Sequence, residues 1–140
     1  TVAAAVVMTG MAFPVAAWSA GKTSKVTVTV RTKHDRGEVR CALHTRSDWM
    51  KDTPKGTQAP PKGKRAVCVF ERIPSGTWAV AVHHDEDGDG EMPTNMMGIP
   101  KEGWGVSRNA GIGMFGGPSF EDAKFNVSNE PVSLDINVRY

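Results

Sequence analysis

The sequence predicts one all-β domain, an antiparallel β-sandwich of about seven strands, and three observations support this. Apolar and polar residues alternate in several segments, which is typical of strands with one buried face. Gly and Pro are frequent, with 15 and 9 copies among the 140 residues, so turns are frequent as well. Long helical patterns are rare, and two sheets packed face to face are the architecture that buries such strands.

Alternation identifies the individual strands. It runs through residues 25–31, 38–45, 66–70, 77–83 and 132–140, with a further strand expected at residues 124–128. A turn separates the first two segments, and a second turn with Pro74 and Gly76 separates the next two. We therefore expect two hairpins or neighbouring strand pairs. The small residues Ala79 and Ala81 share one strand face, which predicts the close approach of another layer.

Two stretches are expected to be loops rather than strands. Residues 45–65 are rich in Lys, Pro and Gly, which predicts a long surface loop with one short helical turn at residues 47–51. Glycine recurs through residues 98–117, which predicts a long Gly-rich loop whose backbone turns often. A second helical turn is expected after Pro118 and Ser119, because both residues favour helix starts.

The first residues differ from the rest of the chain. Residues 1–20 carry no charge and are mostly Ala, Val and Met. This stretch is too short and too interrupted for a membrane span, and the small residues Ala17 and Ser19 suit cleavage by a signal peptidase after Ser19. We expect residues 1–19 to be a signal peptide truncated at its start, residues 24–140 to be the domain, and no membrane span in the mature chain. An uncleaved anchor and a buried apolar strand are the alternatives.

Charge and cysteine content narrow the class of partner and the compartment. The formal net charge is +2, which is too small to favour nucleic acid or an anionic membrane surface as a partner. The two cysteines, Cys41 and Cys68, form an even pair, and such a pair is readily a disulfide in an oxidising compartment. Two buried free thiols are the alternative. Export to the periplasm or the extracellular space is therefore expected.

A short acidic loop is the clearest candidate for a site. Residues 83–95 read HHDEDGDGEMPTN, and with Asp85 as the first position they match the D-x-D-x-D-G start of a calcium loop. Alternate carboxylates in such a loop converge on one ion, and Gly90 allows the sharp turn. The expected cofactor is a weakly bound Ca²⁺, and a solvated Asp-Gly turn is the alternative. The expected ligands are Asp85, Asp87, Asp89, Glu91 and Asn95.

The acidic loop does not match an EF-hand beyond its first half. Its twelfth position is Met96, where an EF-hand requires Glu, and its ninth position is Pro93. A strand rather than a helix leads into the loop. His83 and His84 cannot readily chelate one ion together, because neighbouring residues of a strand face opposite ways.

No catalytic constellation is evident in the sequence, so we expect the protein not to be an enzyme. An acid–base pair of His84 and Asp85 keeps a small hydrolase-like enzyme as the alternative. No nucleophile is marked out, because Ser107 and Ser119 lie in Gly- and Pro-rich segments without a G-x-S-x-G elbow. Residues 111–116, GIGMFG, match G-x-G-x-x-G, but no strand precedes them and no helix follows, so a dinucleotide site is not expected.

The stretch PSGTWAVAVHHDEDGDGEMPTNMMGIPKEGWGVSRNA, followed by FGGPSFEDAKF, closely resembles the bacterial domain-of-unknown-function family numbered 2141. The resemblance covers residues 73–125 and extends to the N-terminal strands by pattern only. It implies an exported β-sandwich, immunoglobulin-like or transthyretin-like, of unestablished function. Asp87 and Asp89 replace the Asn residues of the family pattern, which adds charge, and Pro93 replaces an Asp, which removes a candidate ligand.

The resemblance also marks residues around the acidic loop that are expected to form an Ω-like loop that holds itself together. A surface patch lined by these residues is the alternative. The marked residues are His84, Lys101, Glu102, Gly103, Trp104, Gly105, Ser107 and Asn109. We expect a binding or accessory module of the cell envelope, with an envelope protein or a glycan as partner and the acidic loop ordered by Ca²⁺. A purely structural envelope domain is a further alternative.

Overall fold

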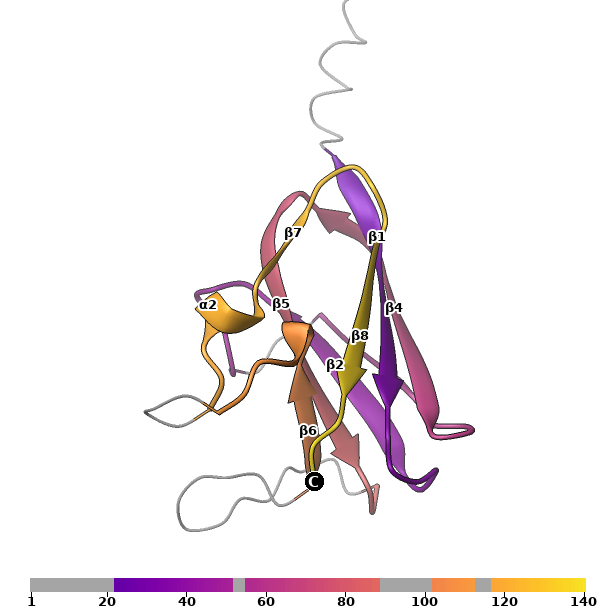
Figure 1. The fold of residues 1–140 in the computed structure, drawn as a ribbon. Helices are drawn as coiled ribbons and strands as arrows, with labels where there is room; N and C mark the ends of the chain where they lie inside the picture. Colours follow the sequence, from indigo (N-terminus) through magenta and orange to yellow (C-terminus); the bar gives the residue numbers. More distant parts are fainter. Residues whose placement is uncertain (1–21, 52–54, 89–101, 113–116) are drawn as a thin grey trace, which may run out of the picture.

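A computed structural model describes residues 22–51, 55–88, 102–112 and 117–140 (Figure 1). The expected signal peptide, residues 1–19, lies outside these residues. Within the described part of the chain each helix is a single short turn, and none could cross a membrane. The elements are β1 (Thr23–Arg31), β2 (Glu38–His44), β3 (Gly56–Ala59), β4 (Arg65–Pro74), β5 (Gly76–Asp85), β6 (Gly103–Val106), the 3-10 helix η1 (Ser107–Asn109), α2 (Phe120–Ala123), β7 (Phe125–Val127) and β8 (Val132–Asn137).

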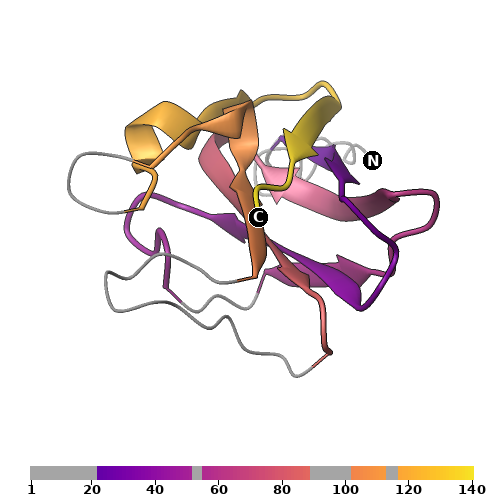
Figure 2. The same ribbon diagram turned by 60° about the horizontal axis from the view of Figure 1, so that its bottom comes forward.

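The strands form two sheets, which confirms the predicted all-β sandwich. One sheet has three strands in the order β4-β1-β8. The other has five strands, in the order β3-β2-β5-β6 with β7 also paired to β5. The strand pairs are antiparallel except for β1 and β8, which run parallel. Figure 2 brings one end of the sandwich forward and shows the C-terminus beside β6, where Trp104 bridges to Arg139.

The two expected hairpins are wrong. Strand β1 pairs with β4 and β8, whereas β2 pairs with β3 and β5. Strands β4 and β5 also follow one another in the chain but lie in different sheets. The chain therefore crosses from one sheet to the other at both turns. Alternation cannot distinguish the two arrangements, because a strand in the facing sheet buries its apolar face just as a hairpin partner does.

The main core lies between the two sheets and is cross-linked by a disulfide. Val26, Val28 and Val30 of β1 face the inner sides of β2 and β5, and all three are fully buried. Cys41 of β2 and Cys68 of β4 form the predicted disulfide and point into this core. The bond therefore joins the two sheets and closes a loop with a sequence separation of 27.

A second apolar cluster covers the outer face of the five-stranded sheet. Ala79 of β5 is fully buried there, in one cluster with Ala110 and with Phe120 and Ala123 of α2, so the predicted close approach of another layer is confirmed. The predicted helical turn is also confirmed, because α2 begins after Ser119, whose hydroxyl accepts a hydrogen bond from the Asp122 N–H. Residues 47–51 form a turn rather than the expected helical turn, and Trp49 of that turn packs against the cluster.

Strands β3 and β6 lie in stretches that were expected to be loops. Strand β3, with the sequence GTQA, lacks alternating apolar residues and is an edge strand beside β2. Strand β6, with the sequence GWGV, contains two glycines that allow the C-terminal segment to cross it closely. A Cβ atom on Gly103 would lie 2.5 Å from Tyr140 and from Val138, and one on Gly105 would lie 2.8 Å from Ile136.

Candidate functional site

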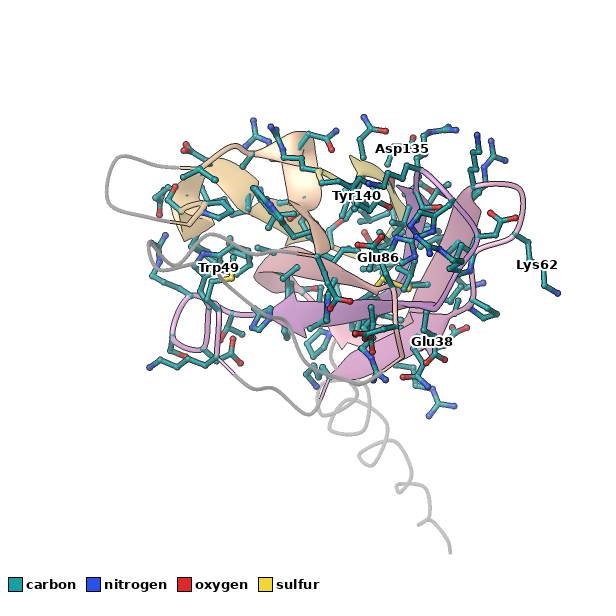
Figure 3. All side chains as sticks on the ribbon, turned by 90° about the horizontal axis from the view of Figure 1, so that it is seen from below. Glu38, Trp49, Lys62, Glu86, Asp135 and Tyr140 are labelled. Atoms are coloured by element: carbon teal, nitrogen blue, oxygen red, sulfur yellow. A yellow bond between two sulfur atoms is a disulfide. The ribbon has the colours of Figure 1, made fainter. Side chains whose placement is uncertain are left out.

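The candidate site lies at the end of the sandwich where β5 finishes and the acidic loop begins. The turn between β1 and β2 and the C-terminal residues 138–140 meet β5 at the same end. Figure 3 looks at this end from below, with Glu86 and Tyr140 near the centre of the view. Titratable side chains from three separated parts of the sequence are therefore close together.

Strand alternation sends the two neighbouring histidines to opposite faces of β5. His84 points inward and is fully buried. Its Nε2 lies 2.6 Å from the carbonyl oxygen of Arg36, so Nε2 carries a hydrogen and donates it. The Tyr140 hydroxyl accepts the Lys33 N–H at 3.1 Å, and its oxygen lies 2.6 Å from His84 Nδ1. Each ring nitrogen of His84 therefore has a hydrogen-bond partner inside the protein.

The network around His84 is structural in character. Both ring nitrogens are occupied by Tyr140 and Arg36, and the ring has no exposed surface. Asp85, the next residue, lies on the opposite face of the strand and does not pair with His84. The acid–base pair on which the hydrolase alternative depended is therefore not formed.

His83 and Asp85 share the outer face of β5 because they are two residues apart. Glu102, which immediately precedes β6, reaches the same place. One donor atom from each of the three side chains lies within 4.8 Å of the other two. We call His83, Asp85 and Glu102 the loop-root cluster, since they flank the acidic loop at both of its ends.

The loop-root cluster is largely shielded from solvent. The side chains of His83, Asp85 and Glu102 are 14%, 0% and 10% exposed. His83 Nε2 lies 2.9 Å from Glu102 Oε1, while Glu102 Oε2 accepts the Glu86 N–H at 3.1 Å. Glu102 therefore ties the far end of the acidic loop to its beginning, and its two oxygens have different partners.

Arg40 supplies positive charge beside the cluster. It lies on the neighbouring strand β2, opposite His83, and its Nε donates to Asp85 Oδ2 at 3.2 Å. The same guanidinium donates to Gln58 at 3.0 Å and is 38% exposed. Burying a carboxylate requires compensating charge, and Arg40 provides part of it for Asp85.

A second ion pair borders the cluster. His34 Nε2 lies 2.6 Å from Glu86 Oε1, and the Arg36 N–H donates to His34 Nδ1 at 3.2 Å. Partial burial alone would raise the pKa of Glu86, but the hydrogen bond with His34 and the charges of His34, His84 and Lys33 outweigh burial. The pKa of Glu86 is therefore lowered below its usual value of 4.5.

The structure describes only part of the predicted calcium loop. Asp85 contributes to the loop-root cluster and is buried, whereas Asp87 is exposed at the start of the acidic loop. The other predicted ligands, Asp89, Glu91 and Asn95, lie outside the described residues. The sequence therefore predicted one member of the cluster, Asp85, as a ligand. It did not predict that Asp85 lies close to His83 and Glu102.

The proximity of His83 and Asp85 could have been predicted from the sequence. His83 and Asp85 are two residues apart on a strand, so alternation alone places them on the same face. Glu102 lies beside them because β6 pairs with β5, and the Gly-rich sequence did not predict this strand. Its position beside β5 depends on the tertiary fold, since 16 residues separate it from Glu86, whose N–H it accepts.

The residues expected to form a surface patch are mostly buried and bonded within the protein. Taken as whole residues, His84, Glu102, Trp104 and Ser107 are each at most 8% exposed, so these four do not line a surface patch. The Ser107 hydroxyl accepts the Val80 N–H at 2.9 Å and lies 2.6 Å from the Ala123 carbonyl oxygen. This arrangement agrees with the expected segment that holds itself together.

Asn109 and Lys101 are the other polar residues that the resemblance marks. Asn109 is exposed, but its side-chain oxygen accepts the Asn137 N–H at 2.8 Å and so fastens η1 to β8. Its backbone has a positive φ of 52°, which Asn tolerates better than most residues. Lys101 lies outside the described residues.

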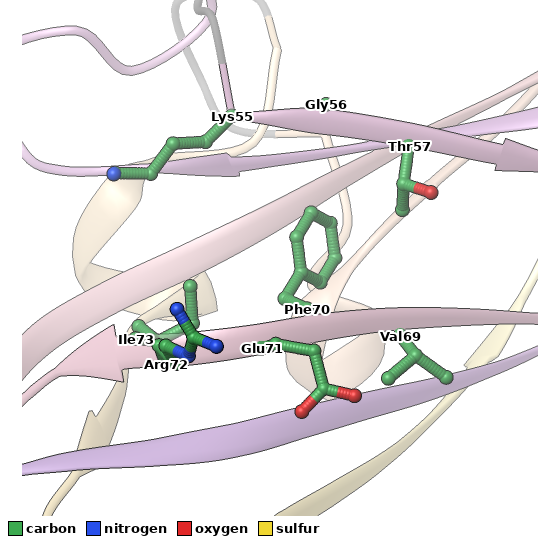
Figure 4. A pocket seen from close by; sticks show the side chains of 8 residues that line it. All are labelled: Lys55, Gly56, Thr57, Val69, Phe70, Glu71, Arg72 and Ile73. Carbon is green, nitrogen blue, oxygen red and sulfur yellow. The ribbon is translucent and has the colours of Figure 1, made fainter.

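A separate groove opens between the edges of β3 and β4 (Figure 4). Its volume is about 340 Å³, and it is lined by residues 55–57 and 69–73. The side chains of Lys55, Glu71 and Arg72 point in different directions rather than toward one another. The groove therefore lacks the convergent polar groups that distinguish the loop-root cluster.

Comparison with known proteins gives one match. A family model described as an uncharacterized protein conserved in bacteria (DUF2141) matches residues 26–135. This range contains the loop-root cluster, the disulfide and most of the sandwich, and it confirms the resemblance expected from residues 73–125. No curated protein and no solved structure matches the chain.

Proposed function

The chain belongs to this bacterial family of uncharacterised proteins, and from its own geometry we propose that it is an exported envelope module that binds a divalent cation at the loop-root cluster. The observation that carries the proposal is the approach of three donor atoms, from His83, Asp85 and Glu102, to within 4.8 Å of one another. His83 and Asp85 at the end of β5, and Glu102 directly before β6, hold these potential ligands close together before any ion binds, which favours cation binding.

The charge of the cluster supports a cation. Asp85 and Glu102 are both shielded from water, and carboxylates in such a setting are stabilised by nearby positive charge. Among the described residues, Arg40 pairs with Asp85 and His83 with Glu102. The acidic loop that follows Asp85 carries further carboxylates, and Ca²⁺ is the ion that its sequence predicts.

Two features support an exported binding role. The Cys41–Cys68 disulfide is characteristic of proteins that fold in an oxidising compartment, and residues 1–19 have the composition of a signal peptide. Among the described residues, the hydroxyl of Ser107 and both nitrogens of His84 are committed to internal hydrogen bonds. We therefore propose a binding module rather than an enzyme, with an envelope protein or a glycan as the partner of its loop end.

The proposal is tested by thermal unfolding and calorimetry of the untagged mature protein, with CaCl₂ or ZnCl₂ against EDTA. Saturation at about ten times Kd should raise the melting temperature by roughly 4 °C, because binding to the folded state alone contributes about 1.4 kcal/mol. Glu102→Gln should abolish the shift, whereas the exposed Glu121→Gln should retain it. No heat of binding and no shift with either ion would contradict the proposal.

A further inference from the structure

We infer that the loop-root cluster selects an ion of the Zn²⁺ class over Ca²⁺, with Arg40 competing with that ion for Asp85. This inference rests on the proposed cation site and specifies its ion. It comes from the donor atoms themselves, because one of the three is the imidazole nitrogen of His83.

The donor set distinguishes the two classes of ion. Ca²⁺ takes six to eight oxygen ligands and rarely accepts nitrogen, whereas imidazole together with carboxylate suits Zn²⁺ and its neighbours among the transition metals. The described part of the cluster offers one nitrogen and two carboxylates. Cys41 and Cys68 are consumed by their disulfide, so no thiolate among them competes for the metal.

The spacing of the donor atoms suits a small ion after modest side-chain rotation. Ligands of a tetrahedral Zn²⁺ lie about 2.0 to 2.2 Å from the metal, which places them roughly 3.3 to 3.6 Å from one another. The present spacings run from 2.9 Å, between His83 and Glu102, to an upper bound of 4.8 Å. Three protein ligands leave a fourth position for water or for a ligand atom from a partner.

Neighbouring contacts orient the ligands in advance. The Glu86 N–H holds Glu102 Oε2 at 3.1 Å, which leaves Oε1 directed at His83. Hydrogen bonds of this kind to a ligating carboxylate fix its direction and raise metal affinity. Glu86 is held in turn by His34, so the orientation extends to the turn between β1 and β2.

Arg40 lies where its charge lowers the affinity of the loop-root cluster for the ion. Its Nε contacts the same Asp85 carboxylate that the ion would use, at 3.2 Å, and like charges exclude one another there. The guanidinium also reaches Gln58 and lies 3.7 Å from Glu38, so it has other partners when the ion takes Asp85. Removal of this competing charge should tighten ion binding, whereas removal of a purely structural salt bridge would not.

The test is a calorimetric titration of the untagged mature protein with ZnCl₂ and with CaCl₂, together with the visible spectrum of the Co²⁺ form. Zn²⁺ should bind roughly 100-fold more tightly than Ca²⁺, and Co²⁺ should give the intense absorption of a low-coordinate site with nitrogen ligation. His83→Asn should weaken Zn²⁺ at least tenfold and change Ca²⁺ less than about twofold. Arg40→Gln should tighten Zn²⁺ about fivefold.

A matched variant controls for indirect effects. Arg46→Gln removes an exposed ion pair with Glu121, far from the contacts that orient the cluster, and should leave Zn²⁺ affinity unchanged. Far-ultraviolet circular dichroism checks that each variant is folded, and His83→Gln replaces His83→Asn if the latter is not. Binding of neither ion overturns both the proposed function and this inference. Equal or tighter Ca²⁺ binding, or unchanged Zn²⁺ affinity in both His83 variants, overturns the inference alone.

Discussion

His83 Nε2 lies 2.9 Å from Glu102 Oε1, and this contact joins the last residues of strand β5 to the residue that immediately precedes β6. The acidic loop leaves the sheet after Asp85 and the chain returns to it at Glu102, so the contact closes the loop at its base. Together with Asp85, the two residues form the loop-root cluster, the one group of three side chains able to ligate a metal that meets within 4.8 Å among the described residues.

The hydroxyl of Tyr140, through its contact with the buried His84 ring, is expected to stabilise this end of the sandwich. Tyr140→Phe removes the hydrogen bonds to His84 Nδ1 and from the Lys33 N–H, and leaves a buried imidazole nitrogen without its partner. The free energy of unfolding should fall by about 1 to 3 kcal/mol in urea titrations. Ser75→Ala, which removes an exposed hydroxyl bond to the Lys22 carbonyl, should cost less than about 0.5 kcal/mol. Equal costs for the two variants would contradict the assigned network.

The C-terminal segment crosses β6 closely, so a larger residue in place of Gly103 should destabilise the protein. In Gly103→Ala the added Cβ would lie 2.5 Å from the Tyr140 ring and from Val138, so the crossing segment must shift. We expect a loss of about 1 to 3 kcal/mol by urea unfolding. Gly56→Ala on β3 is the matched control, because its Cβ would meet only the Cys41 carbonyl oxygen, at 3.6 Å. Gly103→Ala with the stability of the parent would show that the crossing is looser than described.

The His34–Glu86 pair predicts a pH-dependent contribution to stability. Because the pKa of Glu86 in the folded protein is below its usual value of 4.5, the contribution is fully present above about pH 4.5. It is lost as the pH falls through the folded pKa, where the carboxyl becomes protonated. Glu86→Gln should therefore be less stable than the parent at pH 7, and the difference should shrink toward pH 3.

The measurement is urea unfolding in EDTA at several pH values, so that metal binding does not contribute. Glu130→Gln, on an exposed segment, controls for the loss of one negative charge. A Glu86→Gln deficit that stays constant from pH 7 to pH 3 would exclude the ion pair as its cause.

The disulfide is expected to contribute to stability mainly by limiting the unfolded chain. For a separation of 27 residues the chain-entropy estimate is about 3.5 kcal/mol. A Cys41→Ala/Cys68→Ala variant should lose roughly this amount, and dithiothreitol should destabilise the parent but not the variant. An unchanged parent under full reduction, verified by mass spectrometry after alkylation, would contradict the expectation.

Much of the fold could be predicted from the sequence because a half-buried strand has an obvious period. Val26, Val28 and Val30 show the buried face of β1, and the same alternation in residues 38–45 puts Cys41 on the buried face of β2. Strand pairing could not be predicted in the same way. The turns that follow β1 and β4 contain ordinary turn residues, and such turns serve a crossing between sheets as well as a hairpin.

The candidate site was predicted only in part, and the reason is physical. The acidic sequence predicted Asp85 as a ligand because Asp85 begins the pattern of a calcium loop. That pattern includes only residues that are close in sequence. The partners of Asp85 come from strand alternation, for His83, and from tertiary pairing of β5 with β6, for Glu102. Gly103 and Gly105 belong to the glycine-rich stretch that predicted a loop. They are present in β6 because the C-terminal segment crosses this strand at close range.

The central claim is that a divalent cation binds between His83, Asp85 and Glu102. Crystals of the mature protein grown with ZnCl₂, measured on both sides of the zinc absorption edge, test it most directly. We predict an anomalous difference peak about 2.0 to 2.2 Å from His83 Nε2 and from one carboxylate oxygen each of Asp85 and Glu102. A peak elsewhere on the chain, or no peak at this cluster at saturating Zn²⁺, would contradict the account.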